Sequence, residues 1–572
     1  SLWEKYGVKQ HENVVQEEIT QRKCIFGMDV INLYSSGHMR KDFKLPVQYV
    51  ETMEFSNDKE TESFFDSVGQ LEDHDYYYIF KADIHIPKSL HDTLRCYPIA
   101  ATNRQVEMSE LSEQQQEALK GSTISPKLVA DLHDKKQFML GITQYRIYKE
   151  LGLQFSNFQD VHKFLSDNVY THIINTNTVD RSAAKKEIKR LKALPATQET
   201  KDAIIKQESI STLKKLTNNI CYGLSLCSNV KYRSFELINE VKTLRRRINN
   251  PLTRDFRIIT SSTETGDPNK FLVACMKQNP KTVCDSAVHI GFALLEYSKC
   301  RMASLIHGQL FPFLRENGCT FETITTDTDS IYIEIDFTNS PWENEWQLKK
   351  SLASINESSR EPGGFCDQSV HSKDTILYDN KYEGCVGLFT DEFPVESITK
   401  LKIPRCMVTM GPKCYAVLYE NYELVDGEYV STGTSEKLAR KGVKKTDTTS
   451  SSITKEDQES LTRELLQGGD ARMVGIDTYD APNVLNFFHY YALQAGLIKT
   501  NTLEVSQPRL KNTNMVIANQ IVCKTGLSTR DSKVYIDEDG NFLPFGHYAI
   551  SGLQKILKTN RDVENAYGAK EH

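Results

Sequence analysis

Two aspartates separated by one residue are the clearest chemical feature of the sequence. Asp327 and Asp329 lie in the run Thr326–Ser330, between the apolar alternations Phe321–Thr325 and Ser330–Ile335, which predict two strands of opposite direction. Two carboxylates in so tight a turn repel each other unless a cation lies between them. The run therefore predicts a metal site, and an ordinary hairpin turn without a ligand is the alternative.

A third carboxylate follows from another predicted strand. Asp29 ends the apolar run Cys24–Asp29. Transfer of a phosphoryl group by two metal ions needs carboxylates from separate strands, which hold the ions roughly 4 Å apart. Asp29 can complete such a site with Asp327 and Asp329, although an acid at the end of a strand is more often structural.

A basic stretch supplies groups that suit a polyphosphate. Lys215, Asn219 and Tyr222 are spaced at i, i+4 and i+7 in a predicted helix, so they share one face. Residues 181 to 250 contain 16 Lys and Arg against 6 Asp and Glu. This excess can hold nucleic-acid phosphates. The alternatives are a solvated helical face and an exposed helix end capped by Gly223.

Hydrophobic periodicity predicts the elements that must position these residues. Two lysine-rich helices, Ala183–Leu194 and Asp202–Leu216, are separated by Pro195 and predict an antiparallel pair. A long helix, Cys284–Leu314, is expected to stop before Gly318 and to lead directly into the acidic hairpin. The remaining predictions are strands at Tyr76–Ile86 and Cys406–Leu418, a linker at Thr446–Glu459, and helical patterning at Leu461–Leu466 and Ala481–Leu497.

These residues together resemble the motifs of family B DNA polymerases. Five partial matches occur in the order that the family has, across more than 400 residues. They are Asp29–Tyr34 (motif A), Lys215–Gly223 (motif B), Asp327–Ser330 (motif C), Lys413–Tyr415 (KxY) and Arg440–Gly442 (KG).

The resemblance implies a right-hand polymerase, an α+β fold with an antiparallel-sheet palm, helical fingers and a thumb. Asp29 and Asp327 would be the main ligands of two Mg²⁺ ions, or of Mn²⁺, with Asp329 beside them. Leu33 and Tyr34 would lie at the incoming nucleotide, where Tyr34 excludes a 2′ hydroxyl.

The other matched residues would bind the remaining parts of the substrate. Lys215 would neutralise the triphosphate, and Tyr222 would pack against the nascent base pair. Asn219 and Gly223 would shape the fingers helix at the template base. The residues assigned to the primer and the DNA are Ser330, Lys413, Tyr415, Lys441 and Gly442.

Some residues depart from the family pattern. Asn32 and Ser35 stand where motif A usually has Ser and Pro, and Ile220 stands where motif B usually has Ser. The metal-binding and triphosphate-binding groups are retained. The turn after Asp29 is less rigid without Pro, which affects fidelity more than activity.

The spacing of the motifs resembles the protein-primed branch of the family, found in certain phages, adenoviruses and transposons. Asp29 has 28 residues before it, so we expect no exonuclease domain in this chain, and Asp58–Glu60 resembles an exonuclease DxE by chance. Long stretches near 40–170 and 225–281 leave room for two insertions. Tyr6 and Gly7 stand where the branch has a YxGG element, without its glycines.

The resulting domain prediction divides the chain into six parts. They are a first palm part at 1–41, a first insertion at 42–170, fingers at 171–224, a second insertion at 225–281, a second palm part at 282–445, and a thumb with the C-terminal region at 446–572.

Composition sets the class and the compartment. The 572 residues carry a net charge of -6, and no apolar run approaches the roughly 20 residues of a membrane span. The 13 cysteines lack the spacing of a zinc site, so we expect reduced thiols in an intracellular protein, in nucleus or cytoplasm, without a membrane partner. The expected partners are a DNA primer-template, deoxynucleoside triphosphates and a terminal priming protein.

Three other functions are compatible with parts of the pattern. An active polymerase that uses an ordinary nucleic-acid primer is the nearest. A catalytically silent relative, serving as a DNA-binding scaffold, would usually have lost a metal carboxylate, whereas Asp29, Asp327 and Asp329 are all present. A nuclease would leave Lys215 and Tyr222 without a role.

Overall fold

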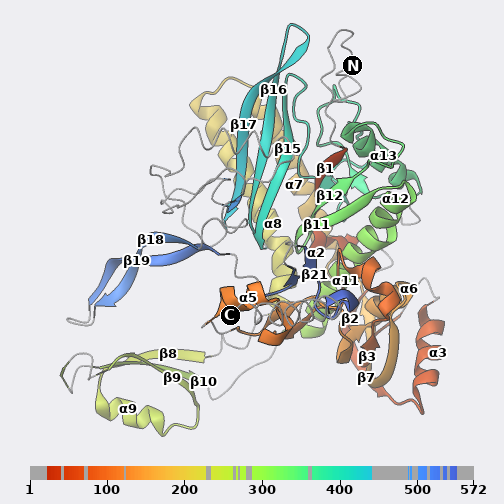
Figure 1. Cartoon of the computed structure of the whole chain (residues 1–572). Coiled ribbons are helices and arrows are strands. Elements are labelled where there is room, and N and C mark those ends of the chain that lie inside the picture. The colour runs from red at the N-terminus through yellow and green to blue at the C-terminus, as the bar shows by residue number, and fades with distance from the viewer. Residues whose placement is uncertain are drawn as a thin grey trace, which may run out of the picture.

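The computed structural model describes most of the chain (Figure 1). The described residues are 22–39, 44–69, 75–120, 124–226, 233–261, 266–267, 271–278, 286–358, 364–411, 413–440, 487, 490–491, 500–511, 516–528, 532–537 and 541–550. The predicted linker Thr446–Glu459 and helix Leu461–Leu466 lie outside them, as does most of Ala481–Leu497.

A five-stranded sheet carries the acidic residues. Its strand order is β11-β12-β1-β14-β13, and β1 runs antiparallel to both of its neighbours. The two predicted strands of the acidic hairpin and the strand that ends at Asp29 are confirmed. The bounds are β1 Lys23–Val30, β11 Thr320–Asp327, β12 Ser330–Asp336, β13 Cys366–Asp367 and β14 Phe389–Asp391.

One face of this sheet is buried by helices. Cys24, Phe26, Met28 and Val30 alternate along β1 and share a core with the helices behind it. The predicted long helix is confirmed as a continuous helical stretch that ends just before Gly318. Its parts are α11 Val288–Leu305, the π-helical turn η4 Ile306–Leu310 and α12 Phe311–Glu316, and α13 Glu345–Ser358 packs beside them.

The predicted helical pair is longer than its lysine-rich stretches. It consists of α7 Thr171–Lys192 and α8 Gln198–Ser225, which run side by side (Figure 1). Thr197 caps α8 by accepting a hydrogen bond from the backbone N–H of Thr200. Buried Asn177 donates to Asn218 across the pair at 2.9 Å. The short helix α2 Leu33–Met39 contacts both α7 and α8.

The predicted strand Cys406–Leu418 is wrong as a single strand. Two strands, β15 Lys400–Gly411 and β16 Cys414–Val425, occupy this region and pair antiparallel with each other. The chain reverses next to Lys413, which has a left-handed φ of 61°. Apolar alternation lies on both sides of the reversal, and Gly411-Pro412 between them is the turn signal that the prediction overlooked. The third strand of this tall sheet is β17 Glu428–Arg440.

A four-stranded sheet lies between β1 and the helical pair in sequence. Its order is β2-β7-β3-β6, with one core formed by this sheet, α6 and α11. The predicted strand Tyr76–Ile86 is confirmed as β3. The elements of this region are β2 Leu45–Met53, α3 Asp58–Gly69, β3 Tyr76–His85, η1 Lys88–Leu90, α4 His91–Leu94, β4 Thr102–Arg104, η2 Met108–Glu110, α5 Glu113–Leu119, β5 Lys127–Val129, β6 Lys135–Gly141, α6 Ile142–Glu150 and β7 Gln154–Asp167.

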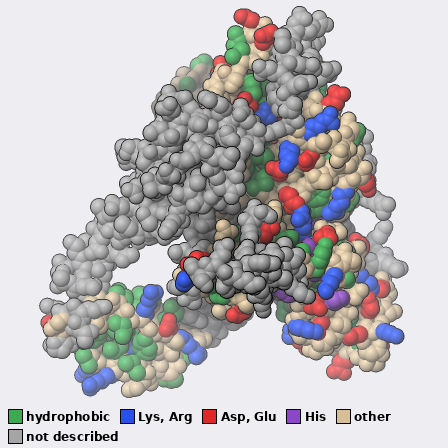
Figure 2. Space-filling model, in the orientation of Figure 1, with side chains coloured by type: hydrophobic (Ala, Val, Ile, Leu, Met, Phe, Trp, Pro, Cys, Tyr) green, Lys and Arg blue, Asp and Glu red, His purple; other side chains and the backbone are tan. Residues whose placement is uncertain are grey.

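A smaller sheet, β8-β10-β9, follows α8 and lies apart from the five-stranded sheet, at the lower left of Figure 1. Phe235, Leu237 and Ile258 are more than half exposed, and Figure 2 shows apolar side chains gathered on this part of the molecule. So small a module cannot bury all of its apolar residues. Its elements are β8 Arg233–Ile238, α9 Val241–Ile248, β9 Thr253–Thr260 and β10 Leu272–Gln278.

The described C-terminal part contains two separate hairpins. A long one pairs β18 Thr500–Lys511 with β19 Val516–Ser528, and a short one pairs β20 Tyr535–Ile536 with β21 Phe542–Leu543. The fold class is therefore mixed α+β with several antiparallel sheets, as predicted at that level. None of the described helices is both long and apolar enough to cross a membrane.

Candidate active site

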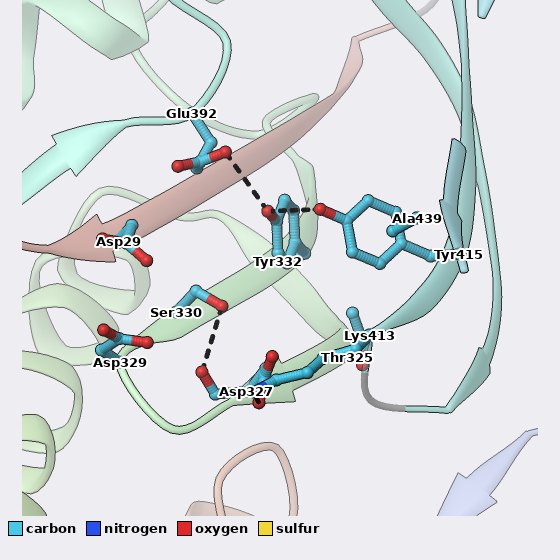
Figure 3. Close-up of a pocket in the computed structure, with 10 residues that line it drawn as sticks. All are labelled: Asp29, Thr325, Asp327, Asp329, Ser330, Tyr332, Glu392, Lys413, Tyr415 and Ala439. Carbon is cyan, nitrogen blue, oxygen red and sulfur yellow. Dashed lines mark hydrogen bonds and ion pairs between the residues drawn. The ribbon is translucent and has the colours of Figure 1, made fainter. Parts of the chain in front are cut away.

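Three strands bring the predicted aspartates together. Asp29 lies opposite Ser330 in the pairing of β1 with β12, and Asp327 lies opposite the same serine across the hairpin turn. Thr328, with a left-handed φ of 62°, tightens the turn and places Asp329 at its tip. All three carboxylates line one cavity of about 270 Å³ (Figure 3).

A fourth carboxylate, which the sequence reasoning missed, lines the same cavity. Glu392 directly follows β14, and its backbone N–H donates to the carbonyl of Gly27 at 2.8 Å. Its side chain accepts from Lys437 at 3.1 Å and from the Tyr332 hydroxyl at 3.5 Å. No local motif marks Glu392, because only the pairing of a three-residue strand with β1 brings it to Asp29.

Two of the carboxylates, Asp29 and Asp329, have a raised pKa. Burial is the main cause that raises the pKa of Asp29 to about 7, and the negative charges of Asp329 and Glu392 add to it, while Lys215 opposes them. Burial, together with the charge of Asp327, also raises the pKa of Asp329. Such a cluster is stabilised by a positive charge among its members.

The donor set suits a hard divalent cation. It consists of carboxylate oxygens from separate strands, the ligands that Mg²⁺ and Mn²⁺ prefer. In the described part of the chain, no three His, Cys, Asp or Glu side chains are close enough to hold an ion as they stand. Asp327 instead pairs with Lys413 at 3.3 Å. The carboxylates therefore fit a divalent cation by their ligand type and by their placement around one cavity.

One cation of the helical pair lies near the acids. The charge of Lys215 on α8 acts on both Asp29 and Asp329. Desolvation lowers the pKa of Lys185 on α7, and the charges of Arg181 and Lys215 lower it further, although more than a third of the Lys185 surface is accessible. The sequence reasoning counted Arg181 and Lys185 in the basic stretch but assigned neither to the site. Their i, i+4 spacing was the available signal, but the predicted helix began at Ala183, after Arg181.

Two tyrosines from different elements stack between the acids and these cations. The rings of Tyr34 on α2 and Tyr222 on α8 lie 4.5 Å apart with an interplanar angle of 7°. Burial, with Tyr222 as the next cause, raises the pKa of Tyr34 to about 12. The flat apolar surface of such a pair suits contact with a sugar or a base.

The other predicted nucleotide residues differ in placement. Leu33 is buried in the core behind the sheet, so only its backbone can contact a ligand. Asn219 and Gly223 are exposed on α8, and the helix continues past Gly223 to Ser225.

Three of the predicted primer residues, Ser330, Lys413 and Tyr415, line the cavity together with the acids. Lys413 and Tyr415 flank the reversal between β15 and β16, and the Tyr415 hydroxyl is 3.1 Å from that of Tyr332. Ser330 is buried, and its hydroxyl donates to the carbonyl of Asp327 at 3.4 Å. Lys441 and Gly442 lie outside the described residues.

The site thus combines four carboxylates and Lys413 around one cavity, with Lys215 and a pair of stacked rings near these acids. It can bind a polyanion together with divalent metal ions, and it presents an aromatic surface beside them. The chain matches no protein-family model, no curated protein and no solved structure. Its function is therefore inferred from the chemistry of its own residues.

Proposed function

We propose that this chain is a DNA-directed DNA polymerase, similar to family B enzymes, that adds deoxynucleotides to a DNA 3′ end. One observation carries the proposal. Carboxylates from three separate strands meet in one cavity, and the charge of Lys215 on α8 acts on two of them, Asp29 and Asp329. Two-metal phosphoryl transfer to a triphosphate substrate needs this division of charge.

In this proposal the acids hold two divalent ions, which activate the 3′ hydroxyl and stabilise charge on the triphosphate. Asp29, Asp327 and Asp329 bind the ions, and Glu392 is a further ligand. Lys215, Lys185 and Arg181 neutralise the phosphates. Tyr34 excludes a 2′ hydroxyl, and Tyr222 packs on the nascent base pair.

The right-hand architecture belongs to the same proposal. The five-stranded sheet serves as the palm, α7 and α8 serve as the fingers, and the C-terminal region supplies the thumb. Lys413 and Tyr415 hold the primer end next to Asp327, to which Lys413 is already paired. Lys441 and Gly442 would follow β17 at the palm-to-thumb junction.

Protein priming is supported by two extra modules. The sheet β2-β7-β3-β6 lies in sequence between Asp29 and the fingers, and the sheet β8-β10-β9 lies between the fingers and α11. Both occupy the positions at which the protein-primed branch carries its insertions. Exposed Lys242, Arg245 and Arg246 on α9 suit contact with a DNA backbone. A terminal priming protein is the proposed partner, and a nucleic-acid primer is the alternative.

The test is extension of a labelled DNA primer on a DNA template with Mg²⁺ and deoxynucleotides. We expect extension by the native chain and none by Asp327→Asn, which removes a ligand charge. Asp336→Asn is the matched control, because Asp336 ends β12 away from the acidic turn and accepts hydrogen bonds from the backbone and the side chain of Thr338.

Undiminished extension by Asp327→Asn would refute the proposed metal site. Failure of the native chain to extend any primer would favour the silent DNA-binding scaffold. Addition of a first nucleotide to a protein hydroxyl, tested with candidate priming proteins, separates the two priming modes.

A further inference from the structure

A side-chain hydrogen bond joins the fingers to the turn that follows Asp29. Arg181 on α7 donates from Nη1 to Oδ1 of Asn32 at 2.6 Å. Asn32 is one of the residues that depart from the motif A pattern, in which a shorter serine is usual. The side chain at this position therefore reaches a partner on the fingers.

Asn32 is a fixed acceptor. Its φ of 49° is left-handed, a conformation that Asn tolerates better than other non-glycine residues. Its carbonyl accepts the backbone N–H groups of Ser35 and Ser36 at 2.9 and 3.1 Å, at the start of α2. The backbone around Asn32 is thereby fixed, so the amide can hold Arg181 in one place relative to Asp29.

Arg181 makes fewer hydrogen bonds than a desolvated guanidinium group needs to satisfy its donors. Its Nε is buried without a hydrogen-bond partner among the described residues. Desolvation lowers its pKa, and its charge acts on Lys185 one helical turn away. A neutral amide is a weaker partner for guanidinium than an ionised phosphate, which accepts shorter and stronger hydrogen bonds.

We infer that Asn32 is a positioning residue, which holds Arg181 against the palm until the phosphates of an incoming nucleotide replace the amide as its partner. This inference rests on the proposed function. The exchange releases α7 from the turn after Asp29 and so couples nucleotide binding to movement of the fingers. Asn32 competes with the nucleotide for Arg181 and thereby sets its affinity.

Two substitutions at Asn32 change this competition in opposite directions. Asn32→Gly removes the acceptor and suits the left-handed backbone, so apparent nucleotide affinity should rise roughly 3- to 10-fold, the equivalent of one neutral hydrogen bond. Asn32→Asp adds a charge that holds Arg181 more tightly, so affinity should fall at least about tenfold. If Asn32 acts through Arg181, neither substitution should change nucleotide affinity in a chain that also carries Arg181→Met. This comparison is a double-mutant cycle.

The experiment measures the Kd of a non-incorporable α,β-imido deoxynucleotide with Mg²⁺ and primer-template, and the single-turnover extension rate in the same samples. Asn157→Gly is the matched control, because Asn157 also has a left-handed φ, of 53°, and lies on β7. A near-native thermal midpoint of unfolding shows that each variant is folded.

Equal Kd values for native, Asn32→Gly and Asn32→Asp chains, with normal native extension, would overturn the inference while the proposed function stands. Loss of affinity in Asn32→Gly would also overturn it, since Asn32 would then bind the nucleotide itself. A native chain that fails to extend refutes the proposed function separately. In that case the Kd of inorganic triphosphate is measured instead. We expect tighter binding by Asn32→Gly and weaker binding by Asn32→Asp than by the native chain.

Discussion

At the scale of single residues, the stacked pair Tyr34 and Tyr222 connects the acids with the helical pair. Tyr34 comes five residues after Asp29 and is the second residue of α2. Its position in the chain therefore keeps it close to the end of the strand that carries Asp29. Tyr222 comes from α8, whose Lys215 acts on the same acids. A nucleotide bound to both groups would place its sugar against Tyr34.

Replacing Tyr34 with a smaller residue should weaken the selection of deoxynucleotides. Tyr34→Ala opens space for a 2′ hydroxyl, so we expect discrimination against ribonucleotides to fall roughly 10- to 100-fold, the range of steric selection in a pocket. The measurement is kcat/KM for matched deoxy- and ribonucleotides. Tyr34→Phe keeps the ring and should keep native selection, and unchanged discrimination in Tyr34→Ala would contradict the steric role.

The sequence predicts those site residues that belong to a local pattern. Asp327 and Asp329 share one turn, and Lys215 and Tyr222 share one helical face, so spacing alone places each pair. Glu392 has no such pattern, because it reaches Asp29 only through the pairing of β14 with β1. Arg181 has the i, i+4 spacing to Lys185, but its hydrogen bond to Asn32 depends on the tertiary packing of α7 on α2.

At the scale of elements, α11 joins the five-stranded sheet to the first extra module. Glu296 on α11 is buried, and its Oε2 accepts from the Tyr77 hydroxyl on β3 at 3.3 Å and from the backbone of Gly141. A Cβ at Gly141 would collide with both side chains, so glycine is needed there. The Oε1 atom has no partner among the described residues, as suits a protonated acid.

Stability should therefore fall as pH rises. Burial raises the pKa of Glu296 to about 8 from an ordinary 4.5. Between these values the folded chain keeps a proton that the unfolded chain has released, so the free energy of unfolding drops with rising pH, by at most about 1.4 kcal/mol per pH unit. Glu296→Gln should reduce this slope in thermal midpoints measured from about pH 5 to 8. Exposed Glu117→Gln is the control, and an unchanged slope in Glu296→Gln would refute the assignment.

Elements with strong periodicity were predicted well, and chain reversals were not. The long helix before the hairpin has apolar residues close to a 3.6-residue period, and most of them are buried. The lysine-rich pair was predicted instead from its lysines and Pro195, and its helix α8 leaves Leu213 and Leu216 more than half exposed. The reversal at Lys413 was missed because the strand prediction followed the alternation across Gly411-Pro412, a dipeptide that is typical of turns. The left-handed φ at Lys413 is a backbone property that its residue type does not favour.

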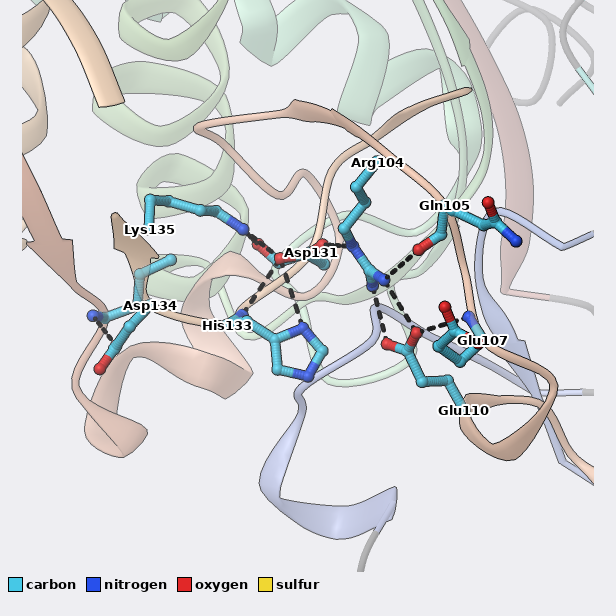
Figure 4. A network of polar contacts seen from close by, with 9 residues as sticks. Arg104, Gln105, Glu107, Glu110, Asp131, His133, Asp134 and Lys135 are labelled. Atoms are coloured by element: carbon cyan, nitrogen blue, oxygen red, sulfur yellow. Dashed lines mark hydrogen bonds and ion pairs between the residues drawn. The ribbon is translucent and has the colours of Figure 1, made fainter. Parts of the chain in front are cut away.

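At the scale of the whole molecule, residues more than 400 positions apart form one small core. Tyr535, Leu543 and Phe545 pack against Val106 and Val129 of the first extra module. Beside this core, buried Asp131 is paired with Lys135 and with Arg104, and the Arg104 Nε–Asp131 Oδ2 distance is 2.6 Å (Figure 4). No local pattern predicts this association, because each segment is short and the partners are distant in sequence.

Asp131 should hold this junction together. Burial alone would raise its pKa, but hydrogen bonds and charge from His133, Lys135 and Arg104 hold the pKa well below its usual range. Asp131→Asn removes the charge paired with buried Lys135, while Arg104 keeps its pair with Glu110, so we expect a loss of roughly 3–5 kcal/mol. Faster hydrogen exchange in residues 532–550, which dock here, should accompany it.

The control for this junction is Asp160→Asn. Asp160 pairs with Lys81 at 2.7 Å on the surface, where solvent screens the pair and its contribution to stability is small. Equal destabilisation by the two substitutions, or unchanged exchange in 532–550, would contradict the role of Asp131.

The central claim is that Asp29, Asp327 and Asp329 hold two divalent ions for nucleotide transfer. The most direct measurement counts bound Mn²⁺ by electron paramagnetic resonance, with primer-template and a non-incorporable deoxynucleotide present. We predict two ions per native chain and at most one in Asp327→Asn, with two retained in Asp336→Asn. No bound Mn²⁺ in the native chain, or the same count in Asp327→Asn, would contradict the claim.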